Sequence, residues 1–139
     1  MFIDASAIVA ILLDAPGADG LEAQLERAGG PYFVSPLVIH HACTAVARAK
    51  TTAQSATDAR RIAQAHEAVD ALVKALQARE ITISSDIGRI ALDAAATYGR
   101  DSGHRAGLSH AQCYSYACAK AYRLKLLYSG EAFAHTDLA

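Results

Sequence analysis

The stretch FIDASAIVAIL, residues 2–12, decides the fold that this sequence predicts. Two apolar residues, Phe2 and Ile3, lead directly to an acid, Asp4, and an alanine-rich run typical of a helix follows. The pattern predicts a short buried strand that ends at a carboxylate, followed by a helix over residues 5–13. A strand followed directly by a helix is the repeating unit of an α/β protein.

The same alternation continues along the chain. Ser35 and Pro36 are typical of a helix start, because serine caps helices and proline suits the first helical position. Further strands are predicted over residues 32–34, 81–83 and 124–128. Further helices are predicted over residues 18–28, 35–50, 58–79, 84–99 and 110–122, with breaks at 51–57, 100–108 and 129–139. Alternating strands and helices favour a parallel sheet with both faces covered, in a single domain over residues 1–139.

Composition limits the kind of protein this is. The chain has 139 residues, of which 53% are hydrophobic and 19% charged, so it can bury a core and fold. Its net charge of −1 argues against a polybasic mode of nucleic-acid binding. Three cysteines without CxxC spacing suit a reducing, cytoplasmic setting, and no apolar run reaches membrane-spanning length. The N-terminus lacks the basic region of a signal peptide.

Four distant segments are expected to meet at one rim of the sheet. Ligands of parallel sheets sit outside the carboxyl ends of the strands. Asp4 follows the first predicted strand, and Glu131 lies just after the last one. The helix starts at Ser35 and Ser109 should face the same rim. The sequence therefore predicts a site assembled from both ends and the middle of the chain.

These segments resemble the PIN-domain toxins of VapBC toxin–antitoxin pairs. FIDASAIVAIL is similar to the opening of that family, SPLVIHHACTAVARAK (35–50) to its second segment, and AGLSHAQCYSYACAKAYRLKLLYSGEAFAHTDLA (106–139) to its C-terminal segment. The resemblance covers nearly the whole chain. It implies a PIN-like three-layer α/β/α sandwich, a homodimer, a small antitoxin partner, and cleavage of RNA that depends on magnesium or manganese.

The acidic cluster implied by this resemblance is largely replaced. Asp4 matches the family's first metal-binding carboxylate. His41 stands where the family usually has Glu, Gln112 where it usually has Asp, and Ala132 where another Asp is expected. Magnesium requires oxygen ligands and is commonly held by carboxylates, whereas histidine prefers softer metals. One remaining carboxylate should therefore hold magnesium weakly.

Two other acids could compensate. Glu131 adjoins the missing acid, although adjacent side chains of an extended segment point to opposite faces. Asp137 could fold back from the tail, or it could be a cap or a salt-bridge partner. Ser6, Ser109 and Thr136 match family positions with supporting roles, and Arg100 and Arg105 are candidate contacts for RNA phosphates.

A transition-metal site is a separate hypothesis. His110 and Cys113 are three residues apart on a predicted helix and could share a face. Asp4, His41 and His110 would form a mixed ligand set for zinc or a related ion, and Cys113 is a further candidate ligand. The alternative is that His40 lies on the surface, His110 in a first helical turn, and Cys113 in the core.

Three functions follow from these patterns. The residues favour a pseudo-nuclease, meaning a PIN scaffold that keeps its partner and has lost efficient cleavage. An active ribonuclease with an atypical metal site is the second hypothesis, and a His/Cys metal-binding protein is the third.

Overall fold

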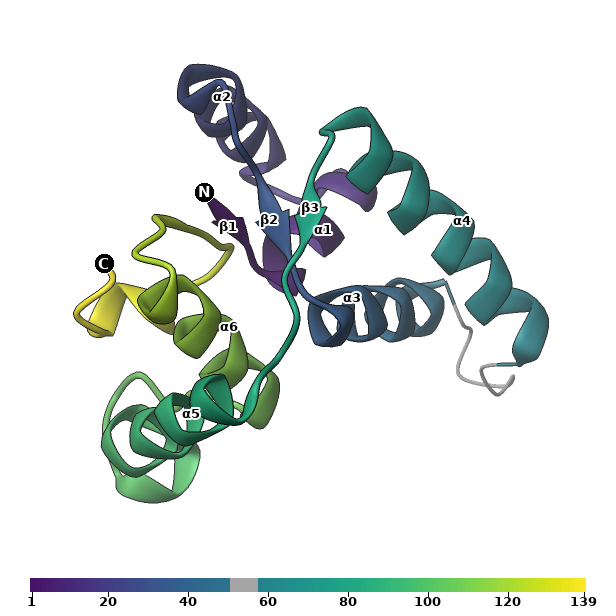
Figure 1. The fold of residues 1–139 in the computed structure, drawn as a ribbon. Coiled ribbons are helices and arrows are strands. Elements are labelled where there is room, and N and C mark those ends of the chain that lie inside the picture. The colour runs from purple at the N-terminus through teal and green to yellow at the C-terminus, as the bar shows by residue number, and fades with distance from the viewer. Residues whose placement is uncertain (51–57) are drawn as a thin grey trace.

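The computed structural model describes residues 1–50 and 58–139, so the predicted polar break over 51–57 lies outside the described residues. Within them the chain forms an α/β sandwich (Figure 1). The elements in chain order are β1 (Phe2–Ile3), α1 (Ala5–Leu12), α2 (Ala18–Ala28), β2 (Phe33–Val34), α3 (Pro36–Ala49), α4 (Ala59–Ala75), β3 (Arg79–Glu80), α5 (Ser85–Tyr98), α6 (His110–Ala121) and β4 (Leu126–Leu127). Two short 3-10 helices, η1 (Arg100–Ser102) and η2 (Phe133–His135), complete the described elements.

The described strands form one parallel sheet with the order β3-β2-β1-β4. Phe2 pairs with Phe33 of β2 on one side and with Leu126 of β4 on the other. In Figure 1, α5 and α6 lie to one side of the strands, and α3 and α4 lie to the other. Helix α6 contacts β1, while α1 contacts α2, α3 and α4. The predicted parallel sheet between helical layers is confirmed.

Local cap chemistry explains where most helices begin. Asp4, Ser35, Asp58, Ser84 and Ser109 each accept a backbone N–H of the helix that follows. The first N–H groups of a helix have no intrahelical partner, so an acceptor at the N-cap stabilises the start by about 1 kcal/mol. Three of these caps follow strands or strand-like segments and thereby fix where the chain turns at the rim.

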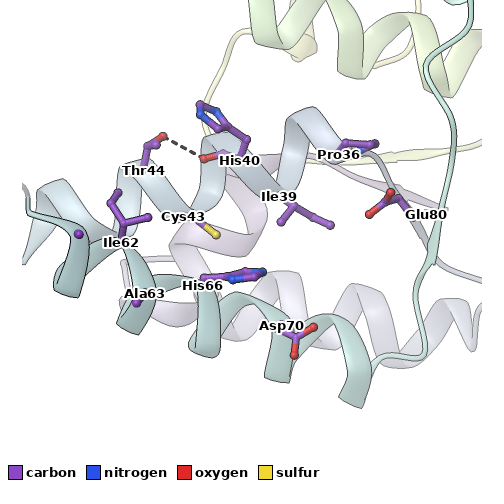
Figure 2. A pocket seen from close by; sticks show the side chains of 11 residues that line it. Pro36, Ile39, His40, Cys43, Thr44, Ile62, Ala63, His66, Asp70 and Glu80 are labelled. Carbon is purple, nitrogen blue, oxygen red and sulfur yellow. Dashed lines mark hydrogen bonds between the residues drawn. The ribbon is translucent and has the colours of Figure 1, made fainter.

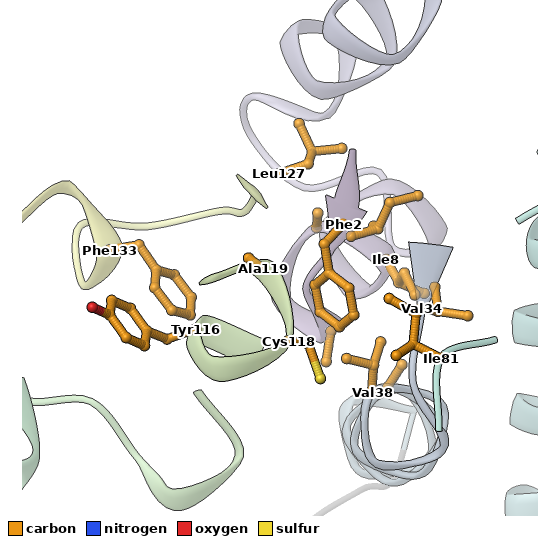
Figure 3. Close-up of a cluster of buried hydrophobic side chains, with 14 of the residues drawn as sticks. Phe2, Ile8, Val34, Val38, Ile81, Tyr116, Cys118, Ala119, Leu127 and Phe133 are labelled. Carbon is orange, nitrogen blue, oxygen red and sulfur yellow. The ribbon is translucent and has the colours of Figure 1, made fainter. Parts of the chain in front are cut away.

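The core lies between the sheet and its helices (Figure 3). Phe2 and Phe133 are its largest fully buried side chains, and Val34, Val38 and Ile81 pack near Phe2. Alanine and cysteine fill much of α6, where Ala117, Cys118 and Ala119 are fully buried. Small side chains let this part of α6 pack closely against the sheet, where the helix contacts β1.

Two predicted elements were misplaced along the chain. The third strand was predicted over 81–83, but β3 is Arg79–Glu80, and Ile81 contributes a single further hydrogen bond to Val34. The preceding helix was predicted to reach residue 79, whereas α4 ends at Ala75 and Gln77 adopts a positive φ of 51°. The exposed β3 lies at the edge of the sheet, where apolar residues are not required. The fourth strand is also shorter than predicted.

Candidate functional site

The sheet has a switch point between β1 and β4. The chain moves outward from β1 to β2 and β3, and then returns to place β4 on the opposite side of β1. The carboxyl ends of strands at such a point flank a crevice where parallel sheets bind ligands. Asp4 follows β1 directly, and Ser129 follows β4 two residues after Leu127. The position of Asp4 therefore suits a functional carboxylate.

Asp4 is buried, and its carboxylate already has two protein donors. The backbone N–H of Ser6 donates to Oδ2 over 2.9 Å, and the Ser6 hydroxyl donates to the same oxygen over 2.6 Å. The Ser6 hydroxyl in turn accepts a 3.0 Å hydrogen bond from the backbone N–H of Ser129. Asp4 is only 2% exposed, so a cation would reach it through little open surface. Ser6 thus contacts both Asp4 and the segment after β4, and its supporting role at a site stays a prediction.

Gln112 is engaged at the start of α6. Its Oε1 accepts the backbone N–H of Ser109 over 2.9 Å, and the Ser109 hydroxyl accepts the backbone N–H of Gln112 over 3.3 Å. This reciprocal pair is a capping box, which satisfies two otherwise unpaired backbone donors. Both residues were predicted at the site, and the structure gives each of them a structural task. Gln112 contributes a neutral oxygen that already accepts one hydrogen bond.

The remaining positions of the expected acidic cluster supply little negative charge. His41 is half-buried on α3, and its backbone carbonyl accepts a hydrogen bond from the Thr44 hydroxyl. Ala132 is partly buried and packs against the hydrophobic core. Glu131 is exposed in the turn before η2. Asp4 is therefore not joined by a second acid from the positions that the family resemblance implies.

The tail residues Thr136 and Asp137 bind elsewhere. Asp137 accepts a 2.8 Å hydrogen bond from the Tyr116 hydroxyl and forms an ion pair with Lys120, both on α6. The hydrogen bond from Lys120 and that from Tyr116 lower the pKa of the Asp137 carboxyl, although partial burial opposes them. Thr136 donates to the Phe133 carbonyl and accepts from the Leu138 N–H. These contacts correspond to the salt-bridge alternative for Asp137 and to a local role for Thr136.

The transition-metal ligand set is not assembled. In residues 1–50 and 58–139, no three His, Cys, Asp or Glu side chains lie where they could hold a metal ion. His40 and His110 are exposed, His110 is in the first turn of α6, and Cys113 is buried in the core. Burial also raises the pKa of the Cys113 thiol, which disfavours the thiolate that a metal needs. The hypothesis of a site built from His41, His110 and Cys113 was wrong.

Arg100 lies beside the start of α6. Arg100, Ser109 and His110 line a hollow of about 260 Å³, and Cys113 contributes to its wall. A bridge between Gly99 and Leu108 closes the loop that carries Arg100 and Arg105, and both arginines are exposed. The structure thus brings Arg100 to the predicted rim segment. A contact of either arginine with RNA remains a prediction.

Sequence reasoning missed several residues that shape these surfaces. Ser129 was not singled out, although its N–H ties the end of β4 to Ser6. Tyr116 and Lys120 are four residues apart on α6, and this helical spacing could have indicated a shared partner. A groove between α3 and α4, with His66, Asp70 and Glu80 in its lining, was also missed.

No described helix is long and apolar enough to cross a membrane.

Comparison with known proteins identifies the family. The PIN domain family matches residues 1–138. The chain is 45% identical over 139 residues to the VapC ribonuclease R02377 of Rhizobium meliloti, with 99% of this chain and 98% of the relative covered. It is 33% identical over 138 residues to Ribonuclease VapC42 of Mycobacterium tuberculosis, with 99% and 96% covered. Ribonuclease VapC30 of the same species is 33% identical over 145 residues, with 100% and 96% covered. Because the matches span almost its full length, this chain belongs to the PIN-domain family as a VapC-type protein.

Proposed function

We propose that this chain is a VapC-type protein of a toxin–antitoxin pair that binds its partner protein but retains magnesium too weakly for efficient RNA cleavage. The relatives that share its full length are named VapC ribonucleases, which supports the toxin–antitoxin assignment. One observation supports the proposed loss of cleavage. The Asp4 carboxylate is held by Ser6, and no group of three potential ligands surrounds it within the described residues.

The chemistry of magnesium explains why this arrangement is insufficient. Magnesium demands oxygen ligands in octahedral geometry and dehydrates reluctantly, so protein sites usually anchor it through one or two carboxylates together with substrate phosphates. At the expected positions this chain offers the carboxylate of Asp4 and the amide oxygen of Gln112, which already accepts the Ser109 N–H. The other two positions hold the imidazole of His41 and the methyl group of Ala132. The residues present do not fit a retained divalent ion. Asp4 alone could still contact a magnesium ion that the RNA phosphates carry. The affinity would be much lower than that of a site with two or more carboxylates.

Metal binding and cleavage should be measured together. The purified chain would be titrated with magnesium and with manganese by calorimetry, and the same samples would be assayed on a structured RNA. We expect a dissociation constant in the millimolar range or weaker, and no metal-dependent cleavage above that of the Asp4→Asn variant. Efficient cleavage that requires metal and disappears in Asp4→Asn would overturn the proposal in favour of an active ribonuclease with an atypical site.

A restoring variant tests the placement of the site. His41→Glu, Gln112→Asp and Ala132→Asp together would return the carboxylates that the family resemblance implies. The triple variant should bind magnesium at least about tenfold more tightly, which corresponds to about 1.4 kcal/mol. A matched triple of His41→Gln, Gln112→Asn and Ala132→Asn controls for altered packing, because it adds similar volume without charge. Equal metal affinity of the two triples would show that these positions do not form the site.

The remaining parts of the proposal concern assembly. We propose that the chain forms a homodimer in the cytoplasm, binds a small antitoxin protein, and contacts RNA through Arg100 and Arg105. Sedimentation of the purified chain tests the dimer. Co-purification with the product of an adjacent small reading frame tests the partner. Loss of RNA binding in Arg100→Gln, with binding retained in Arg89→Gln on α5, tests the phosphate contact.

A further inference from the structure

Three cations lie close together in the turn that connects α6 to β4. Lys120, Arg123 and Lys125 fall within six residues of the sequence, and Tyr122 lies among them. Residues 120–125 are called the basic turn below. The chain as a whole has a net charge of −1, so this concentration of positive charge is local.

The hollows of the structure differ in charge. The groove between α3 and α4 is acidic, because Asp70 and Glu80 line it and no lysine or arginine does (Figure 2). Two hollows of about 500 Å³ each meet at the basic turn, and Lys125 lines both of them. Asp137 is the one acidic side chain among the described residues that line these two hollows. An anion is therefore attracted to the basic turn and repelled by the groove.

Two of the three cations have no acidic partner among the described residues. Lys120 forms an ion pair with Asp137, and its ammonium lies 5.9 Å from the centre of the Tyr116 ring. Arg123 and Lys125 are exposed, and they take part in none of the ion pairs between described residues. Guanidinium and ammonium groups are the usual protein donors to phosphate oxygens. Arg123 and Lys125 are therefore available to a phosphate-bearing ligand.

The backbone fixes the position of these cations before any ligand arrives. The N–H of Arg123 donates to the Lys120 carbonyl over 3.2 Å. The next N–H, that of Leu124, donates to the Ala119 carbonyl over 2.9 Å, and the two bonds together close the end of α6. The carbonyl of Lys125 accepts the first N–H of β1 over 2.8 Å. The basic turn is thus fixed both to α6 and to the sheet.

Tyr122 adds an aromatic surface beside the cations. It is 53% exposed, although large apolar residues are generally buried in this chain. Nucleobases stack on exposed aromatic rings, and this stacking tolerates any base sequence. A free phosphate ion gains nothing from such a ring. Cations that flank an exposed tyrosine therefore favour single-stranded nucleic acid over a simple anion.

We infer that the basic turn is a second contact for single-stranded RNA, with phosphates at Arg123 and Lys125 and a base stacked on Tyr122. This inference rests on the proposed function, because it extends the proposed contact with RNA beyond Arg100. Charge at the phosphates supplies most of the affinity, and stacking on Tyr122 selects an unpaired strand.

The basic turn is separate from the acidic rim. Lys125 precedes β4, whereas Asp4 follows β1, so the two lie at opposite edges of the parallel sheet. Arg100 lies beside the start of α6 and the basic turn lies at its end. The two ends are about 18 Å apart, because α6 has 12 residues at about 1.5 Å each. The basic turn therefore holds RNA without any metal ion at Asp4.

The test measures RNA binding by fluorescence anisotropy, with a labelled oligouridylate of about 12 nucleotides and a chelator present. Arg123→Gly removes a cation and also relieves a positive φ of 53°. Gln77→Gly is its matched control, because Gln77 is exposed and has a φ of 51° in the turn after α4. Lys125→Gln is compared with Lys74→Gln on the exposed side of α4. Tyr122→Ala is compared with Tyr122→Phe, which keeps the ring.

The three variants that remove a contact should each weaken RNA binding by at least about threefold, while the three controls should bind like the unmodified chain. Arg123→Gly combined with Lys125→Gln should lower the salt dependence of binding by about 1.4 in log–log slope, since each phosphate contact on a single strand contributes about 0.7. Both glycine variants should unfold at the same urea concentration as the unmodified chain or a higher one. Weaker binding by Arg123→Gly would then not be a consequence of unfolding.

The outcomes separate this inference from the proposed function. Normal binding by the basic-turn variants, with weaker binding by Arg100→Gln, would refute the inference and keep the contact at Arg100. The reverse result would keep the inference and refute the contact at Arg100. Normal binding by Tyr122→Ala alone would contradict the stacked base and assign the basic turn to phosphates only. If the unmodified chain binds no RNA, both RNA contacts are wrong, and the metal and partner measurements still decide the rest of the proposed function.

Discussion

The Ser6 hydroxyl lies 2.6 Å from Oδ2 of Asp4, and this contact joins the end of β1 to the first turn of α1. Ser6 also accepts the N–H of Ser129, so the same hydroxyl connects β1 with the segment after β4. Asp4 accepts the backbone N–H of Ser6 as the N-cap of α1. The carboxylate at the switch point therefore has a structural task that is independent of any metal.

Removal of the Asp4 side chain should destabilise the protein even without metal. Asp4→Ala loses the N-cap and leaves the Ser6 hydroxyl without its acceptor, so we expect a loss of about 2–3 kcal/mol in the free energy of unfolding. Asp4→Asn keeps an acceptor oxygen and should lose less than about 1 kcal/mol. Urea denaturation in the presence of a chelator measures both. Asp93→Ala, at an exposed position on α5, is the control and should change stability by less than about 0.5 kcal/mol. An equal loss in the Ala and Asn variants would show that the charge, and not the cap, is what stabilises α1.

Tyr116 should make the protein sensitive to alkaline pH. Burial, together with the hydrogen bond to Asp137 and its negative charge, raises the pKa of Tyr116 above its ordinary value of 10.0. The neutral phenol is thus favoured in the folded protein, so its stabilising contribution is complete below pH 10 and decreases as pH rises above the unfolded pKa. At pH 11 the loss should be about 1.4 kcal/mol relative to pH 9. Tyr116→Phe should remove this part of the pH dependence, and Tyr122→Phe, at an exposed tyrosine, should keep it. Parallel pH profiles for the unmodified chain and Tyr116→Phe would contradict the assignment.

Local chemistry made part of the structure predictable. The helix starts at Asp4, Ser35 and Ser109 were predicted because an N-cap depends on a few adjacent residues. The parallel sheet followed from the alternation of strands and helices. The third strand was misplaced because the apolar Ile81–Ile83 stretch has strand character, whereas pairing with β2 uses Arg79 and Glu80. Strand register depends on a partner far along the chain, which periodicity alone does not reveal.

The candidate site was less predictable for the same reason. Asp4 could be placed because the strand it follows has a recognisable pattern. The role of Asp137 was open in the sequence, where a metal ligand and a salt-bridge partner were both alternatives. Its actual contact is with Tyr116, which lies 21 residues earlier in the chain. The Gln112 side chain accepts the Ser109 N–H, so a residue at a family site position serves here as part of a helix cap. The groove between α3 and α4 was not predicted, because it depends on how two helices pack.

The capping box of α6 should be measurable in single variants. Gln112→Ala leaves the Ser109 N–H without its side-chain acceptor, and we expect a loss of about 0.5–1 kcal/mol. Gln112→Glu keeps the acceptor and adds a negative charge at a helix N-terminus, so its stability should equal or exceed that of the unmodified chain. Gln64→Ala, at an exposed position of α4, controls for loss of a glutamine side chain. Denaturation midpoints give the differences. If Gln112→Ala is as stable as Gln64→Ala, the capping box contributes nothing to stability, and the Gln112 side chain is free to serve the rim.

The three cysteines should react slowly in the folded protein. Cys43, Cys113 and Cys118 are buried and form no disulfide. Burial raises the pKa of all three thiols, and that of Cys118 to about 11, so the reactive thiolate is scarce at pH 8. Ellman's reagent should label none of them within minutes in buffer and all of them in urea. Cys43 points into the groove between α3 and α4, so it should be the first to react as the chain opens. The Cys43→Ala variant should therefore lose the earliest labelling phase, whereas Cys118→Ala should keep it. Rapid labelling of Cys113 or Cys118 in buffer would mean that α6 detaches from β1 far more readily than its buried packing implies.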